Sequence, residues 1–139
     1  MRLLPAALAL ALAALPLPLA AEGSTEDGRV LLLPGDREVS DPTTGVTFRL
    51  TAVTDQRCPA DVACVWEGMI RLEIEAVLAP DDSRSVILCN ACDDGGRTAD
   101  LPGMILRFEG LEPSTAELAR RARLPVLQDY TASIALSAP

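Results

Sequence analysis

Residues 70–78 alternate between apolar and polar side chains, and this pattern constrains the fold more than any other stretch of the sequence. The apolar positions on one side of this alternation are Ile70, Leu72, Ile74, Ala76 and Leu78. A spacing of two places these side chains on one face of an extended strand, whereas a helix would scatter them around its circumference. We therefore expect a β-sheet with one face on a core and the other in water.

Other stretches show the same alternation of apolar and polar side chains. In residues 46–53 the apolar positions that share one side are Val46, Phe48, Leu50 and Ala52, and in residues 130–136 they are Tyr130, Ala132, Ile134 and Leu136. Shorter strand candidates are residues 29–33, 37–40, 85–89 and 104–108. About six or seven short strands separated by turns predict a mainly β fold, either a β-sandwich or an open barrel.

One short helix is expected near residues 114–124. Ser114 and Glu117 have the spacing of a capping box, and the residues that follow are good helix formers. Glu117 lies near the predicted start and three arginines lie near the end, which is the order that the helix dipole favours. Because Pro125 cannot continue the helix, a length of about two or three turns is expected.

The first residues predict export. Met1 and Arg2 give a positively charged start, and residues 3–19 contain only Leu, Ala and Pro. This pattern is typical of a secretory signal peptide covering residues 1–21, cleaved after Ala20 or Ala21. We expect a flexible mature N-terminus at 22–28 and a single β domain at 29–139. The mature protein is then periplasmic or secreted, with no stable membrane insertion after signal cleavage.

The amino-acid composition excludes several classes of function. The chain has no histidine and a formal net charge of −8. The missing imidazole excludes histidine-based acid–base catalysis, Ser-His-Asp and Cys-His nucleophile systems, and histidine metal sites. The strong negative charge disfavours nucleic acid and anionic membrane surfaces as partners. A non-enzymatic role without cofactor or metal is therefore expected.

The four cysteines are expected to form two disulfides, because an exported protein folds in an oxidising compartment. Three pairings are possible. The sequence favours Cys58 with Cys64 and Cys89 with Cys92, because each pair is local and flanked by turn residues. A thiol-exchange site at Cys89 and Cys92, or a zinc site, is the alternative, but Asp93 and Asp94 beside the pair would raise the pKa of its thiols.

Residues 55–68 contain the first cysteine pair and the only tryptophan. If the strand register of residues 70–78 continues backwards, Trp66 shares a face with Ile70 and is expected to face the core. Gly68 lies where a bulge or a close backbone approach is expected. The stretch therefore predicts a disulfide-tied corner whose tryptophan closes one end of the core.

At this stretch the chain resembles a group of small, mostly uncharacterised exported bacterial proteins. They share an Asp-x-Arg-Cys-Pro…Cys-x-Trp-x-Gly segment, which corresponds here to Asp55, Arg57, Cys58, Pro59, Cys64, Trp66 and Gly68. A second likeness near the C-terminus covers Leu111, Pro113, Asp129 and Tyr130. The resemblance implies no activity, because the group has none assigned.

The polar side chains of this corner are the candidate binding surface. They are Asp55, Arg57, Asp61 and Glu67. Arg57 is expected to pair with a neighbouring carboxylate and fix the corner. Acidic turns at residues 81–82 and 93–94 lack the spacing of a calcium loop, so we expect them to be ordinary solvated surface turns. We therefore expect a non-enzymatic exported β domain that binds a protein or small-molecule partner or serves an envelope role. The alternative is a redox-active or metal-binding protein using Cys89 and Cys92.

Overall fold

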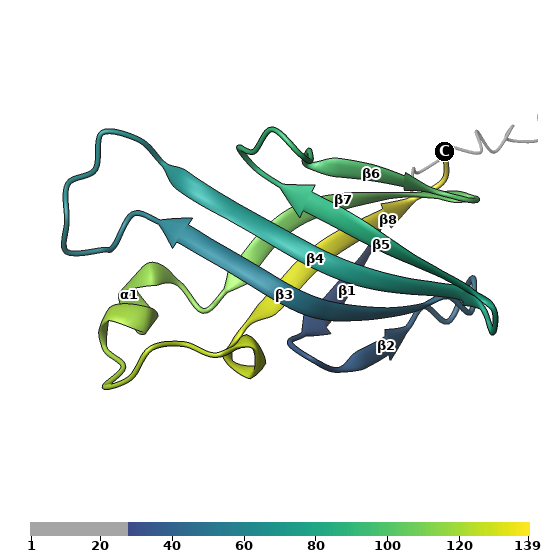
Figure 1. Ribbon diagram of the computed structural model, residues 1–139, viewed down its shortest axis with the longest axis horizontal. Helices are drawn as coiled ribbons and strands as arrows, with labels where there is room; N and C mark the ends of the chain where they lie inside the picture. Colours follow the sequence, from purple (N-terminus) through teal and green to yellow (C-terminus); the bar gives the residue numbers. More distant parts are fainter. Residues whose placement is uncertain (1–27) are drawn as a thin grey trace, which may run out of the picture.

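Eight β-strands account for most of the residues that the computed structural model describes, which are 28–139. The expected signal peptide and residues 22–27 of the expected flexible segment lie outside the described residues. The strands are β1 (Arg29–Pro34), β2 (Glu38–Ser40), β3 (Thr47–Arg57), β4 (Gly68–Ala79), β5 (Asp82–Cys89), β6 (Thr98–Leu101), β7 (Met104–Glu112) and β8 (Thr131–Ser137). Within residues 28–139, one α-helix, α1 (Thr115–Ala119), and one 3-10 helix, η1 (Leu127–Asp129), lie between β7 and β8 (Figure 1).

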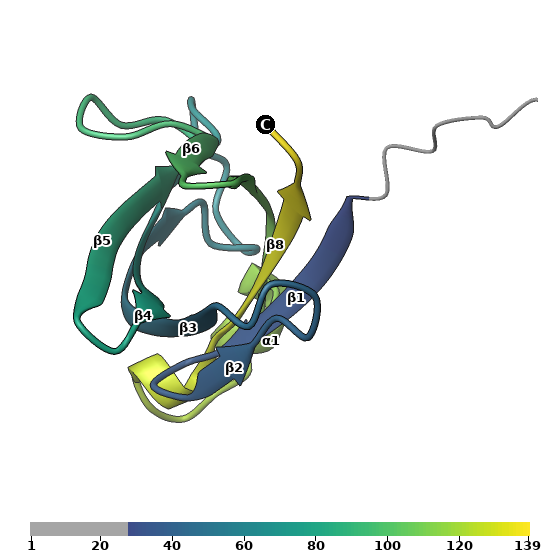
Figure 2. The same cartoon turned by 90° about the vertical axis from the view of Figure 1, so that its right-hand side faces the viewer.

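The strands form two four-stranded antiparallel sheets, with the orders β1-β8-β7-β6 and β2-β3-β4-β5. Figure 2 shows the sheets curving around a common interior, and neither closes on itself. The mainly β, sandwich-like architecture expected from the sequence is confirmed, and the open-barrel alternative is not needed. The strand that the sequence analysis missed is β6, which forms a tight hairpin with β7 through Pro102 and Gly103. Gly103 has a φ of 78°, as the second central position of such a turn requires.

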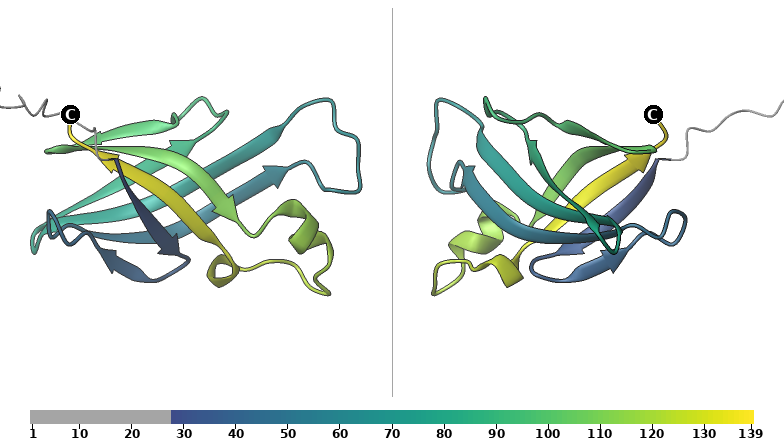
Figure 3. Two further views of the ribbon diagram at one scale, coloured as in Figure 1. Left: turned by 180° about the vertical axis from the view of Figure 1, so that it is seen from behind. Right: turned by 45° about the vertical axis from the view of Figure 1, so that its right-hand side comes forward.

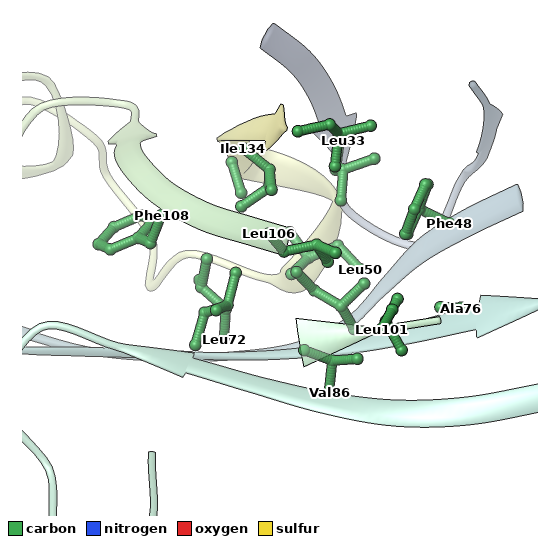
Figure 4. Close-up of a cluster of buried hydrophobic side chains, with 14 of the residues drawn as sticks. Leu33, Phe48, Leu50, Leu72, Ala76, Val86, Leu101, Leu106, Phe108 and Ile134 are labelled. Atoms are coloured by element: carbon green, nitrogen blue, oxygen red, sulfur yellow. The ribbon is translucent and has the colours of Figure 1, made fainter. Parts of the chain in front are cut away.

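The core consists of the inward-facing residues of both sheets. In β4, Ile70, Leu72, Ile74 and Ala76 are buried, as their alternation predicted. They belong to one cluster with Leu106 of β7 and Ile134 of β8, and Figure 4 shows Leu72 and Ala76 of this cluster with those two residues. Burying one such aliphatic side chain stabilises the fold by about 1.5 to 3 kcal/mol, so this interior is the main source of stability.

A β-bulge in β3 changes which residues of that strand face inward. Leu50 pairs with Ile74, but the next pairs are Ala52 with Glu73 and Val53 with Leu72. Directly paired residues point to the same face of a sheet, so Val53 turns inward and Ala52 turns outward. The expectation that Ala52 faces the core is therefore wrong. The same shift brings Asp55 and Arg57 to the inner face, at the end of the strand.

The helix is shorter than expected. It ends at Ala119, with Arg120 as the C-cap, although the predicted capping box of Ser114 and Glu117 is present. None of its residues is buried, and so short a helix gains little stability without a buried face. Beyond it, Arg121 and Arg123 form ion pairs with Asp129 instead of extending the helix.

Candidate functional site

One end of the sandwich carries a pocket that four separate segments enclose. These are the end of β3, the β3–β4 loop (residues 58–67), helix α1 and residues 120–130, which gather at the left of Figure 1 and at the right of the back view in Figure 3. The pocket, here called the end pocket, has a volume of about 310 Å³. Its lining residues are Asp55, Arg57, Pro59, Asp61, Thr115, Leu118, Ala119, Pro125 and Tyr130.

Asp55 and Arg57 form an ion pair at the base of the end pocket. The Nε of Arg57 donates to Oδ1 of Asp55 at 2.8 Å, and Nη2 donates to Oδ2 at 2.7 Å. The Asp55 side chain is 8% exposed and the Arg57 side chain is 17% exposed. A two-point contact of this kind fixes both planes, so the pair is rigid and largely shielded from water. Arg57 thus pairs with a neighbouring carboxylate, as expected.

Arg57 also ties β3 to the segment that leads into α1. Its Nη1 donates to the carbonyl of Leu111 at 3.1 Å, and its Nη2 donates to the carbonyl of Pro113 at 2.8 Å. The Glu112–Pro113 peptide bond between these carbonyls is cis. Because an arginine has five N–H donors, the four bonds made by this side chain leave little capacity for a ligand.

Tyr130 lies beside this pair and is buried at the start of β8. Burial raises the pKa of its hydroxyl, and the adjacent Asp55 carboxylate raises it further. For Asp55, burial would raise the pKa, but the hydrogen bonds from Arg57 outweigh burial and hold the pKa below its usual value. At neutral pH the cluster therefore contains an ionised Asp55, a charged Arg57 and a neutral Tyr130, with no net charge.

The remaining predicted binding residues lie on the β3–β4 loop, which the Cys58–Cys64 disulfide closes with an S–S distance of 2.05 Å. Pro59 and Asp61 line the end pocket. Asp61 is exposed, and within residues 28–139 it makes neither an ion pair nor a side-chain hydrogen bond. Glu67 is also exposed but does not line the pocket. Of the four predicted binding residues, three therefore meet at one place.

Trp66 does not face the core. It is 57% exposed, so the expectation that it closes one end of the core is wrong. The reason lies at Gly68, where β4 begins with a φ of 85°. This left-handed conformation interrupts the extended backbone, and the register of β4 does not continue back to residue 66.

Gly68 is required where it lies for a second reason. A Cβ atom at this position would lie 2.3 Å from the carbonyl oxygen of Gln56 and 2.7 Å from Cα of Arg57. The close backbone approach expected from the sequence is therefore present, and it presses the start of β4 against the end of β3. This contact holds Arg57 at the base of the end pocket.

Several large apolar side chains are exposed on the two segments that also contribute Asp61 and Pro125 to the end pocket, and sequence reasoning missed them. They are Val62, Val65, Trp66, Leu124 and Val126, here called the apolar rim. They are near neighbours in sequence of the pocket-lining residues Asp61 and Pro125. The sequence did contain a signal for their exposure. These apolar residues lie in segments without strand or helix periodicity, and a loop has no buried face to receive them.

The second cysteine pair lies outside the end pocket. The disulfide joins Cys89 to Cys92 at the end of β5, and Cys89 is only 1% exposed. Nearby, Arg71 pairs with Asp94 at 3.0 Å. The two local disulfides are those that the sequence favoured, and such bonds are typical of proteins that fold in an oxidising environment outside the cytoplasm.

Comparisons with protein-family models, with curated proteins and with solved structures give no match to this chain. Among residues 28–139, none of the helices is both long and apolar enough to span a bilayer. In the same range, no three acidic or cysteine side chains gather as a metal site would require. The end pocket thus combines mainly apolar walls, an ion pair that neutralises itself, and the carboxylate of Asp61, which has no cationic partner among residues 28–139.

Proposed function

We propose that this protein is a non-enzymatic exported domain that binds a protein partner through the end pocket and the apolar rim. The partner contacts the outer end of the sandwich, while the two sheets serve as a rigid support. The mature protein acts in the periplasm or after secretion, which the signal-like N-terminus and the two disulfides support.

The exposed apolar rim is the observation that supports this proposal most. Val65 is fully exposed, and Trp66 and Leu124 are mostly exposed, although most large apolar residues of the domain are buried. Exposed apolar side chains on segments that also line a pocket are typical of interaction sites, and tryptophan is enriched among the residues that dominate binding energy. Rigid loop closure by the Cys58–Cys64 disulfide reduces the entropy cost of binding.

The alternative function, thiol exchange or metal binding at Cys89 and Cys92, has no comparable support. Exchange needs an accessible, activated sulfur, whereas Cys89 is buried and Asp93 and Asp94 follow the pair. Carboxylates beside a thiol disfavour its thiolate form.

Photocrosslinking in the cells that produce the protein tests the proposal. Val65 is replaced by a photoreactive phenylalanine analogue, and Val30 on β1, also exposed, is replaced in a matched control. We expect a discrete adduct from position 65 that excess unmodified protein suppresses, and no such adduct from position 30. The absence of an adduct at position 65, or identical adducts at both positions, would refute partner binding at this end.

A further inference from the structure

We propose that the end pocket receives a basic side chain of the protein partner, lysine or arginine, with its cationic group at Asp61. This inference rests on the proposed function and specifies the chemistry of the partner. Three properties of the pocket lead to it: its charge, the nature of its walls and its size.

Among the residues that line the pocket, only Asp61 carries a charge that another lining residue does not offset. Asp55 and Arg57 neutralise each other through two hydrogen bonds, and Arg57 spends further N–H groups on two backbone carbonyls. The hydroxyl of Tyr130 is neutral at neutral pH, and burial raises its pKa further. Asp61 lines the same pocket without a cationic partner among the described residues. A ligand group that complements this pocket therefore carries one positive charge.

The walls favour an alkyl chain next to that charge. Pro59, Leu118, Ala119 and Pro125 line the pocket with apolar carbon atoms. Lysine and arginine side chains bury their methylene groups on apolar surface and keep the charged end near water, which is where the exposed Asp61 lies. A purely apolar group would leave the Asp61 carboxylate partly desolvated without a partner.

The size fits one side chain. At about 310 Å³ the pocket is at the lower limit of small-molecule sites, which span about 300 to 1,000 Å³. The apolar rim lies outside it, on the same two segments, and can contact the residues that flank the inserted side chain. This division of pocket and rim favours a side chain on a polypeptide over a free amine.

Titration of the isotope-labelled oxidised protein, followed by NMR, tests the inference with three probes of equal chain length: pentylammonium, pentanol and pentanoate. We expect pentylammonium to shift the amide signals of Asp61, Leu118 and Ala119 at millimolar concentration, pentanol to act more weakly, and pentanoate to have no effect. Equal binding of pentanol would show a neutral apolar pocket, and preferred binding of pentanoate would show an anion site. Either result would overturn the inference.

Two variants separate local pairing from general acidity. Asp61→Asn keeps the shape and removes the charge, and we expect it to weaken pentylammonium binding about three- to fivefold. Glu67→Gln removes a charge from the same loop at a position outside the pocket. We expect this variant to bind pentylammonium with the wild-type dissociation constant. Equal weakening by both variants, or by neither, would contradict a role for Asp61. Because the side chain of Asp61 is exposed and makes no hydrogen bond among residues 28–139, its replacement leaves the fold intact.

A capped Leu-Lys-Leu peptide tests the source of the cation. We expect it to bind more tightly than pentylammonium, because its leucines reach the apolar rim. Tighter binding of the free amine would overturn the assignment to a polypeptide side chain. The crosslink at position 65 is measured independently of the probe titrations. If the probes fail to bind but the crosslinked adduct persists, the inferred basic side chain is refuted and the proposed partner binding is not.

Discussion

At the residue scale, Arg57 has the largest structural role at the site. It neutralises Asp55 and fastens β3 to the carbonyls of Leu111 and Pro113, so one side chain joins two strands from different sheets. The pocket base therefore contributes architecture, whereas the binding chemistry that we propose belongs to Asp61 and the walls. The sequence already favoured a structural role for Arg57, because carboxylates flank it closely.

Replacing Arg57 by Met should strongly destabilise the domain. The substitution leaves the mostly buried Asp55 carboxylate without its cation, which costs about 3 to 5 kcal/mol in unfolding free energy. Urea unfolding followed by circular dichroism measures this loss. The double variant Asp55→Leu, Arg57→Met should recover part of it. Arg84→Met, which breaks an exposed pair with Asp82, should cause no measurable change, and a loss equal to that of Arg57→Met would contradict the account.

Asp55 should also contribute to acid sensitivity. Its pKa is lower in the folded state than in the unfolded chain, so its stabilising effect is complete above about pH 4 and is lost as the pH falls through the folded value. Unfolding free energy measured from pH 7 to pH 2 should therefore decrease less steeply below pH 4 in Asp55→Asn than in the wild type. Parallel curves would show that Asp55 keeps its ordinary pKa.

At the element scale, two backbone irregularities shape the site. The bulge in β3 turns Asp55 and Arg57 inward, and the left-handed Gly68 directs the β3–β4 loop away from the core. A regular hairpin would continue the alternation of both strands and bury Trp66. The end pocket and the apolar rim thus depend on departures from ideal strand geometry at these two places.

Gly68→Ala should be far more costly than Gly45→Ala. Both glycines have positive φ values, 85° and 75°, and so both substitutions introduce backbone strain of about 1 to 2 kcal/mol. Only at Gly68 does the new Cβ collide with the backbone of β3, whereas at Gly45 nothing lies within 4 Å. Thermal unfolding of the two variants checks this difference. Equal melting temperatures would contradict the close approach of β3 and β4.

The sequence predicted the secondary structure correctly where the hydrophobic periodicity extended over several residues. It did not predict local backbone irregularities, namely the bulge in β3 and the left-handed conformation of Gly68. The alternation in residues 70–78 correctly predicted β4, and the Ser114–Glu117 spacing located the start of α1. The bulge after Leu50 has no residue signature, so the alternation places Ala52 on the wrong face. Trp66 was misplaced because a glycine can either continue a strand or end it, and the sequence does not distinguish the two.

The candidate site was predictable only in part. Asp55, Arg57 and Asp61 are close in sequence and were expected to act together, and the structure brings them to one pocket. The opposite wall, Leu118, Ala119 and Pro125, comes from a segment more than fifty positions away. Long-range packing sets that meeting point, and no local pattern encodes it.

At the scale of the whole molecule, the disulfides contribute differently from the core. The Cys58–Cys64 bond closes a short loop at the tip of a hairpin, with a sequence separation of 6. Such a small loop restricts the unfolded chain only modestly, so the bond mainly sets the shape of the β3–β4 loop. The core between the sheets holds the fold, and the disulfide shapes the loop that we propose as part of the partner surface.

The variant Cys58→Ser, Cys64→Ser should therefore fold with reduced stability. The expected loss is about 2 kcal/mol in unfolding free energy, from the entropy of the opened loop. The NMR signals of β4 and β8 should keep their positions, while those of residues 58–67 change. Loss of the native signals throughout the sheets would show that this bond is essential for folding and would contradict the division of roles.

The exposure of Trp66 is the most direct test of the central claim, that the β3–β4 loop presents a binding surface instead of closing the core. The chain has a single tryptophan, so its fluorescence reports this position alone. In the native oxidised protein we expect red-shifted emission and efficient quenching by acrylamide, little changed by unfolding in urea. Blue-shifted emission that acrylamide reaches only after unfolding would place Trp66 in the core and contradict the account.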